Sequence, residues 1–239
     1  MIKNIKKLAI VIPAYNEQES IAMVLKNIQA LKTPNIQLIP IVVNDCSNDE
    51  TANIVKELDC VLLDLPVNLG IGGAVQTGYK YAYKNGFDYA LQVDGDGQHP
   101  ASEITKLVNE ALKEENNIII GSRFIKKEGF QSSGIRRLGI SFLRNWIKLF
   151  SGKTIYDNTS GFRLFDKKAL ELASKSYPDE YPEPESIIMF AKKGFKIKEI
   201  PVVMKERQGG ESSIQAFNQL YYMIKVSLAI FYTYIRTKK

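Results

Sequence analysis

The segment YALQVDGDGQH, residues 89–99, decides the fold class of this 239-residue chain. Its start, Tyr89 to Val93, is a short apolar run without regular alternation, which is typical of a strand buried on both faces of a parallel sheet. The run ends at Asp94, where aspartate and glycine alternate and predict a loop. In open α/β sheets, ligands bind at the carboxyl ends of the strands. The segment therefore predicts an α/β protein with polar ligand-binding groups directly after a buried strand.

Strand and helix alternate along the chain before this segment. Leu8 to Ile12 is apolar and ends at Pro13, and Asn16 with Glu19 three residues later predicts a helix cap. Further predicted strands are 38–43 and 60–63, and the helices after them are 49–58 and 74–84. Short apolar strands separated by amphipathic helices predict a mostly parallel sheet that is covered on both faces.

The second half of the chain is less regular. We predict strands at 118–120 and 197–203, helices at 135–150 and 185–193, and a loop at 177–184, where three prolines occur. The composition of 45% hydrophobic and 24% charged residues suits one substantial core and argues against an intrinsically disordered chain. No internal repeat or domain boundary is evident.

The charge and the cysteines narrow the class of protein. A net charge of +6 favours an anionic partner. Cys46 and Cys60 have no paired spacing, which argues against a disulfide framework or a zinc site. The basic start, Met1 to Lys7, precedes an apolar run that is too short for a signal peptide. We therefore expect a cytoplasmic protein.

Two carboxylates from different predicted strands are expected to meet at one edge of the sheet. Asp45 and Asp94 each stand where a strand gives way to a loop. Asp96 and the amide of Gln98 follow in the same loop. Hard cations such as Mg²⁺ or Mn²⁺ take oxygen ligands and keep positions for substrate phosphates. The spacing therefore favours a clamp for a metal ion and a diphosphate. An Asp/Gly turn with no ligand is the less favoured alternative, and Asp45 beside the loop weakens it further.

Two rival interpretations fail on spacing. An EF-hand loop that began at Asp94 would need Gly and Glu where His99 and Thr105 stand. The cluster of Gly70, Gly72 and Gly73 does not complete a phosphate-binding fingerprint. We interpret that cluster as a tight turn before a helix.

One histidine and several arginines are further candidates for the site. His99 is expected in a loop or at a helix entry rather than as a ligand. Guanidinium groups bind phosphate bidentately, and the candidates for phosphate recognition are Arg123, Arg136, Arg137 and Arg163. For any one of these arginines alone, a solvated surface position is the simpler interpretation.

Six motifs occur in a set order along nearly the whole chain. They are PAYNE at 13–17, VNDCSNDET at 43–51, DGDGQH at 94–99, GSR at 121–123, TSGFR at 159–163 and RQGGES at 207–212. With this ordered set, the sequence resembles the family-two glycosyltransferases of GT-A fold, in the dolichyl-phosphate mannose synthase-like branch. The resemblance implies one Rossmann-like α/β domain over residues 1–212, with a mostly parallel central sheet, and a C-terminal amphipathic helix over 213–239.

The resemblance also implies where a nucleotide-diphosphate sugar would bind. The residues that would hold the base and ribose are Pro13, Tyr15, Glu17, Val43 and Asp45. Those that would meet the diphosphate and a Mg²⁺ or Mn²⁺ ion are Asp94, Gly95 and Asp96, with Gln98 completing the metal shell. Asp96 is thus both a metal ligand and a catalytic residue.

Further along the chain, the resemblance implies two phosphate-binding arginines and an acidic residue. Arg123 would face the phosphate of the acceptor, and Arg207 would lie in a loop that closes over the donor. Asp157 matches an acidic position proposed as the base in some relatives, although a phosphate acceptor is already anionic and needs none. The implied reaction is transfer of a hexose, with inversion, from a GDP- or UDP-linked donor.

Four positions depart from the family pattern and leave the nucleotide and the sugar open. Asn44 stands where many relatives carry a second aspartate, Gly95 and Gly97 replace alanine and leucine, and Ser213 replaces a lysine.

The acceptor expected from the resemblance is polyprenyl phosphate, and the basic helix with Arg136, Arg137, Arg144 and Lys148 supports it. Two alternatives stay open: a soluble or polysaccharide acceptor, and a catalytically silent protein that binds nucleotide sugars. No nucleic acid is expected as a partner, and a homo-oligomer is left open.

The C-terminal stretch 220–235 is rich in aromatic and aliphatic residues but contains Lys225. We expect an interfacial helix on the inner face of the cell membrane, with Arg236, Lys238 and Lys239 meeting anionic lipid. A helix buried in the core or at a dimer interface has equal weight.

Overall fold

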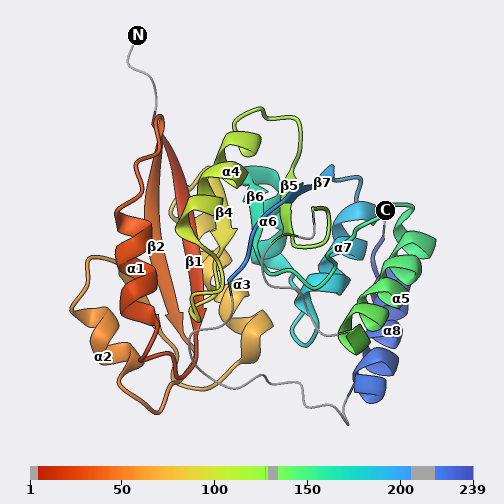
Figure 1. Ribbon diagram of the computed structural model, residues 1–239, viewed down its shortest axis with the longest axis horizontal. Coiled ribbons are helices and arrows are strands. Elements are labelled where there is room, and N and C mark those ends of the chain that lie inside the picture. Colours follow the sequence, from red (N-terminus) through yellow and green to blue (C-terminus); the bar gives the residue numbers. More distant parts are fainter. Residues whose placement is uncertain (1–4, 127, 129–133, 206–218, 239) are drawn as a thin grey trace.

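A computed structural model describes residues 5–126, 128, 134–205 and 219–238 (Figure 1). Its centre is a seven-stranded sheet in the order β3-β2-β1-β4-β6-β5-β7. The strands are β1 (Lys6–Ala14), β2 (Ile36–Asn44), β3 (Val61–Asp64), β4 (Tyr89–Gln92), β5 (Ile118–Ser122), β6 (Arg163–Asp166) and β7 (Ile197–Pro201). All neighbours are parallel except that β6 runs antiparallel to β4 and β5. The predicted α/β class with a mostly parallel sheet is confirmed.

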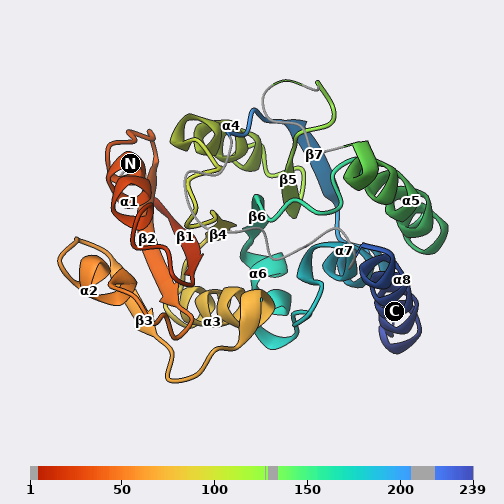
Figure 2. The ribbon, with the colours of Figure 1, turned by 60° about the horizontal axis from the view of Figure 1, so that its bottom comes forward.

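Helices cover both faces of this sheet (Figure 2). One face carries α1 (Ile21–Gln29), α2 (Thr51–Lys56) and α4 (Ala101–Ala111), and the other carries α3 (Gly70–Lys84), α6 (Lys167–Lys175) and α7 (Pro182–Lys192). Beyond α7 lie α5 (Gly134–Ser151) and α8 (Gln219–Arg236), which pack against α7 and against each other.

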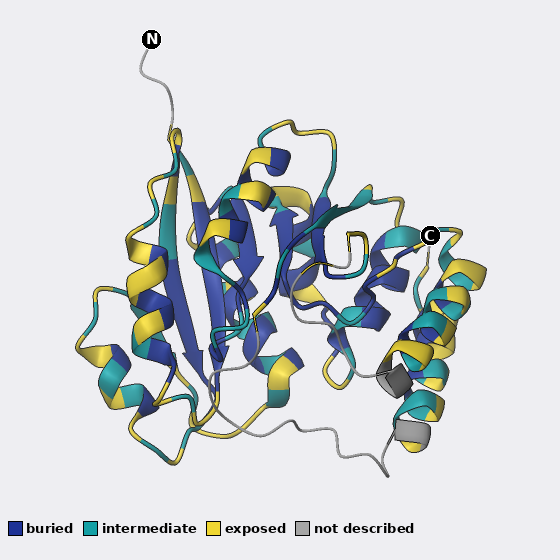
Figure 3. Cartoon of the chain, in the orientation of Figure 1, coloured by how far each residue is buried: buried dark blue, intermediate teal, exposed yellow. Residues whose placement is uncertain are grey.

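The central strand β1 shows how the sequence builds two cores. Successive side chains of a strand point to opposite faces of the sheet. Ala9 and Val11 accordingly join the core under α3 and α6, whereas Leu8 and Ile10 join the core under α1 and α4. All four side chains are fully buried, as Figure 3 shows for the inner strands. A strand buried on both faces needs the unbroken apolar run seen in the sequence.

Strand β6 was absent from the sequence-based prediction. Only Leu164 and Phe165 of its residues are apolar, between Arg163 and Asp166, so no periodic pattern marks it. Leu164 enters one core and Phe165 the other, which is the alternation of a buried strand. Its antiparallel pairing with β4 and β5 joins the two halves of the sheet.

Three local predictions were wrong. Asn16 does not cap a helix: it has a φ of 56°, and α1 begins later, after Ser20. Its side chain instead accepts a hydrogen bond from the backbone of Asn48. The predicted loop 177–184 is wrong in its last part, because α7 starts at Pro182. Proline is tolerated in the first turn of a helix. The glycine cluster that starts at Gly70 forms the first turn of α3 rather than a turn before it.

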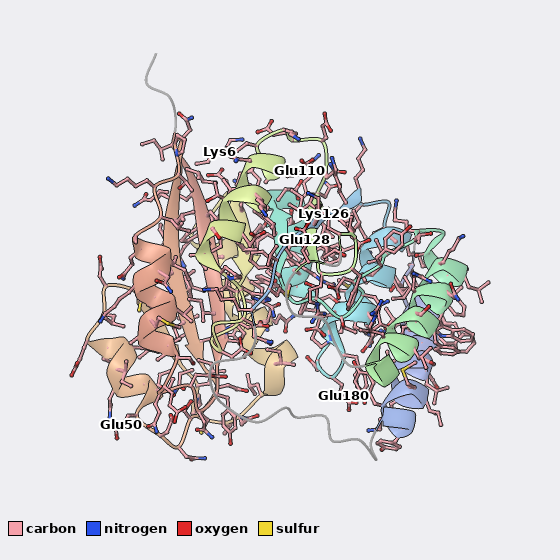
Figure 4. All side chains as sticks on the ribbon, in the orientation of Figure 1. Lys6, Glu50, Glu110, Lys126, Glu128 and Glu180 are labelled. Atoms are coloured by element: carbon pink, nitrogen blue, oxygen red, sulfur yellow. The ribbon has the colours of Figure 1, made fainter. Side chains whose placement is uncertain are left out.

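Helix α8 uses one side to dock on the domain. Val226 and Ile230 are fully buried against α5 and α7, and Thr233 donates a hydrogen bond to Glu185 of α7 at 2.7 Å. Lys225 lies 3.9 Å from Glu180, which Figure 4 labels at the lower end of α5. The predicted boundary between residues 212 and 213 lies outside the described residues. Within the described part of the chain, no helix has the length and apolarity needed to cross a membrane.

The close contact between α3 and β1 makes a test of this packing. A Cβ atom on Gly78 would lie 2.3 Å from Cγ1 of Val11. Alanine favours a helix by about 1 kcal/mol over glycine, but overpacking a core costs about 1–3 kcal/mol. We therefore expect Gly78→Ala to lower the free energy of unfolding in urea denaturation. Adding Val11→Ala removes the clash, so the double variant should be more stable than the sum of the two single changes predicts. A stabilised Gly78→Ala would contradict this packing.

Candidate functional site

Three loops meet at the carboxyl edge of β2, β1 and β4, because β1 pairs in parallel with both neighbours. The backbone N–H of Asp45 donates to the carbonyl of Ala14 at 2.8 Å, and that of Val93 donates to Val11 at 2.9 Å. A Cβ on Gly95 would lie 3.2 Å from the carbonyl oxygen of Pro13, so the acidic loop packs closely against the end of β1. The predicted convergence of Asp45 and Asp94 on one edge is confirmed.

The loop after β1 is tied to the acidic loop by Ser20. Its hydroxyl donates to the carbonyl of Gly95 at 2.7 Å and lies 2.9 Å from Oε2 of Glu17. Tyr15 is exposed at this edge and Glu17 is half-buried, so both side chains can reach a ligand. Pro13 and Val43 are buried and are paired with each other across β1 and β2. If they contact the donor as predicted, they would do so through backbone atoms.

Asp45 is a buried carboxylate with one side engaged. It is 4% exposed, and its Oδ1 accepts a hydrogen bond from the backbone of Leu69 at 2.7 Å. The side chain of Asn68 donates to its carbonyl oxygen at 3.1 Å. These bonds hold the start of α3 beside the loop after β2, and they orient the second carboxylate oxygen of Asp45.

The DGDGQH loop presents its two aspartates differently. The side chain of Asp94 is 34% exposed, whereas Asp96 is 2% exposed and accepts a hydrogen bond from the backbone of Gln98 at 3.0 Å. Gly97 has a φ of 78°, which glycine adopts without strain and which turns the chain between these residues. The loop therefore brings two carboxylates and the half-buried Gln98 together at the sheet edge.

This donor set fits a hard cation that shares its coordination with a ligand. No group of three or more His, Cys, Asp or Glu side chains with metal-site geometry occurs among the described residues. Mg²⁺ is usually bound by one or two carboxylates together with substrate phosphates and waters. Asp94 and Asp96 match that requirement, and the remaining positions would be supplied by a bound diphosphate.

Arg123 and Asp157 form a buried bidentate ion pair beside these loops. Nε and Nη2 of Arg123 donate to the two carboxylate oxygens of Asp157 at 2.8 and 2.7 Å. Asp157 is fully buried and also accepts from the backbone of Arg123 at 2.9 Å, and Glu199 of β7 accepts from its backbone at 2.8 Å. Both carboxylate oxygens of Asp157 are therefore engaged by donors of Arg123. The geometry therefore favours a role for Asp157 in holding Arg123, and the predicted role as a base stays a prediction.

The sequence made Arg163 a candidate for phosphate binding, but the structure contradicts this role. The side chain is 1% exposed, and its donors are used on protein atoms: the backbone oxygens of Ser160, Asn158 and Glu183, and the hydroxyl of Ser186. It thereby connects the TSGFR segment to the start of α7. Arg137 is exposed on α5, and the side chain of Arg136 and all of Arg207 lie outside the described residues.

The sequence-based prediction missed Glu183, in the first turn of α7. Burial raises the pKa of the Glu183 carboxyl, Arg163 opposes this shift, and the charge of Asp94 adds to it. Asp94 and Arg123 both lie near enough to influence this group. Acidic residues are common in the first turn of a helix, but Pro182 and Pro184 concealed the helix start. Glu183 is thus a further carboxylate whose charge interacts with those of Asp94 and Arg123.

A GT-A-like α/β domain with acidic side chains at the carboxyl edge of its sheet is the class that this fold and site define. The model of glycosyl transferase family 2 matches residues 9–172. The chain belongs to this family, and it is a glycosyltransferase.

Two relatives and one solved structure illustrate the similarity. The chain is 31% identical over 220 residues to the UDP-N-acetylglucosamine–dolichyl-phosphate N-acetylglucosaminyltransferase of Methanococcus voltae, covering 82% of this chain and 85% of the relative. It is 25% identical over 236 residues to the polyprenol monophosphomannose synthase of Mycolicibacterium smegmatis, covering 95% and 88%. The fold resembles glucosyl-3-phosphoglycerate synthase from Mycobacterium tuberculosis, crystallised with Mn²⁺, UDP and phosphoglyceric acid, with a TM-score of 0.72, 16% identity and coverage of 98% and 80%.

The variant Asp157→Ala distinguishes two roles of Asp157, which are holding Arg123 in place and acting as a catalytic base. Removing one partner of a buried ion pair costs about 3–5 kcal/mol because the other charge is left uncompensated. We therefore expect a large fall in the melting temperature. Glu171→Ala breaks an exposed pair with Lys175 and serves as the control with an unchanged melting temperature. Loss of turnover in Asp157→Ala at full thermal stability would instead support a catalytic base.

Proposed function

We propose that this glycosyltransferase transfers a hexose, with inversion, from a UDP-sugar to a polyprenyl phosphate and requires Mg²⁺ or Mn²⁺. The observation that carries the proposal is the meeting of Asp45, Asp94 and Asp96 at one edge of the sheet, in a chain whose relatives include enzymes named for dolichyl and polyprenol phosphates. Inversion is supported by the six ordered sequence motifs, which resemble those of the dolichyl-phosphate mannose synthase-like branch of the family.

The chemistry depends on negative charge at the leaving group. When the bond between the sugar and the diphosphate breaks, charge builds on the nucleoside diphosphate. A bound divalent cation would stabilise that charge without a proton transfer. Asp94 and Asp96 would hold the cation. A phosphate acceptor is itself anionic, so the reaction needs no base. This agrees with the structure, in which both carboxylate oxygens of Asp157 accept hydrogen bonds from Arg123.

A groove beside Arg123 supports an amphipathic phosphate as the acceptor. It has a volume of about 720 Å³ and is lined by Phe124, Ile125, Arg137, Leu138, Ile140, Ser141, Arg144 and Tyr156. Its walls combine two guanidinium groups, which bind phosphate, with aromatic and aliphatic side chains, which suit a hydrocarbon chain. Phe124 also packs under the guanidinium of Arg123, at 5.2 Å, so the groove adjoins the catalytic edge.

The free side of Asp45 favours uracil over guanine in the donor. Among the described residues, only its Oδ1 has a hydrogen-bond donor, and Oδ2 is not sealed from solvent. Guanine presents two adjacent N–H donors, from N1 and N2, which a carboxylate binds best with both oxygens. Uracil presents one N–H between two carbonyls, and a single open oxygen matches it.

The test is transfer of radiolabelled sugar into the organic phase with polyprenyl phosphate, a divalent cation and either UDP- or GDP-sugars. We expect labelled lipid with a UDP-sugar, and Asp96→Ala should lower the rate about a hundredfold or more. Asp59→Ala, on an exposed loop away from the site, is the matched control.

Three other outcomes of this assay would contradict the proposed function. Label that enters only a soluble or polysaccharide product would overturn the lipid acceptor. UDP binding without turnover would indicate a silent binding protein, and transfer from GDP-sugars alone would overturn the assignment of uracil.

The outer surfaces of α5 and α8 support membrane association. Exposed apolar side chains on α5 are Leu138, Phe142 and Leu149, and those on α8 are Tyr221, Ile224, Leu228, Phe231, Tyr232, Tyr234 and Ile235. Exposed basic residues accompany them: Arg137, Lys148, Arg236 and Lys238. An apolar face with cationic borders suits the interface of an anionic bilayer. We therefore infer that α8 both packs on the domain and faces lipid.

Flotation with anionic vesicles tests this surface. Replacing Leu228 and Tyr232 together by glutamate should weaken binding by about tenfold or more, because apolar area and favourable charge are both lost. Ile5→Glu introduces one of these two charges at an exposed apolar residue far from α8 and should bind like the unmodified protein. Equal flotation of all three proteins would argue against the interfacial role.

A further inference from the structure

His99 contacts the backbone of a proposed metal ligand. Its Nδ1 accepts a hydrogen bond from the backbone N–H of Asp94 at 3.0 Å. An N–H can donate only to a nitrogen that carries a lone pair, so the neutral ring holds its proton on Nε2. That Nε2 lies 3.8 Å from Oδ2 of Asp94. One imidazole therefore faces both the main chain and the carboxylate of the same residue.

The ring is held rigidly in this position. Its side chain is only 3% exposed, and it stacks on Phe162 with 4.6 Å between ring centroids and 24° between planes. Phe162 belongs to the TSGFR segment, before β6. His99 thus connects the acidic loop to the antiparallel half of the sheet.

The other oxygen of Asp94 is held by a second residue. Gln92, the last residue of β4, donates from Nε2 to Oδ1 of Asp94 at 3.1 Å. Gly161 leaves room for this pair, because a Cβ there would lie 2.5 Å from Nε2 of Gln92. The carboxylate of Asp94 therefore has a set orientation although a third of it is exposed.

We propose that His99 is a positioning residue, which holds Asp94 in its metal-binding orientation by accepting the Asp94 N–H. This rests on the proposed function, in which Asp94 is a metal ligand. Partners that orient a ligand residue commonly change metal affinity by about 10–100-fold when removed. His99 has no direct contact with the cation in this account, and its effect passes through the Asp94 backbone.

Two variants separate the hydrogen bond from the ring. Asparagine places its carbonyl oxygen about where Nδ1 lies and can accept the same N–H, whereas leucine has nearly the same size and accepts nothing. The readout is the dissociation constant of Mn²⁺ in the presence of UDP, measured by electron paramagnetic resonance. We expect His99→Leu to weaken Mn²⁺ binding about tenfold or more and His99→Asn to stay within about threefold of the unmodified protein.

A second readout needs no metal. Hydrogen exchange at the Asp94 amide should be slow in the unmodified protein and in His99→Asn, and fast in His99→Leu. If His99→Leu does not fold, His99→Gln replaces it, because its amide reaches the place of Nε2 rather than Nδ1.

Asp94→Asn distinguishes failure of this inference from failure of the proposed site. If Asp94→Asn leaves Mn²⁺ affinity unchanged, the metal site itself is wrong. If Asp94→Asn weakens binding while His99→Leu does not, or while His99→Asn and His99→Leu weaken it equally, positioning by the hydrogen bond is overturned.

Discussion

The parallel pairing of β1 with β2 on one side and β4 on the other is the constraint on which the site depends. Backbone hydrogen bonds set the register of these strands, and parallel strands end on the same edge. The loops after them must therefore share one space, whatever their side chains. Glycine at position 95 lets the acidic loop approach Pro13, and Ser20 then connects the two loops. The ligand-binding groups are brought together by the sheet rather than by a local motif.

Buried polar side chains stabilise the other half of the site. Strand β6 lies between β4 and β5 and runs antiparallel to both, and Gly161 in the segment before it lies close to Gln92 and Asp94. Arg163 donates to backbone oxygens of this irregular region, and Asp157 accepts from the backbone N–H of Arg123. Unpaired polar groups in such a place would be costly. These charges are buried because they hold the loops, and only Arg123 also adjoins the proposed acceptor groove.

Sequence patterns identified the parts of the fold that rest on apolar periodicity. The strands β1, β2 and β4 and the convergence of Asp45 with Asp94 followed from unbroken apolar runs that end in polar turns. Strand β6 could not be found in this way because it has two apolar residues between charged ones. For Arg163 a surface position was the simpler expectation, because the sequence does not show which backbone oxygens surround a side chain. Glu183 was hidden because prolines that usually break helices here begin one. The tie between His99 and Asp94 depends on loop geometry that spacing alone does not determine.

A crystal structure with Mn²⁺ and UDP tests the central claim most directly, through the anomalous scattering of manganese. The account predicts one strong peak at the carboxyl edge of β4, in contact with a carboxylate of Asp94 or Asp96 and with the diphosphate, and the uracil ring next to Asp45. A manganese peak away from this loop, or a nucleotide bound at the opposite edge of the sheet, would contradict it.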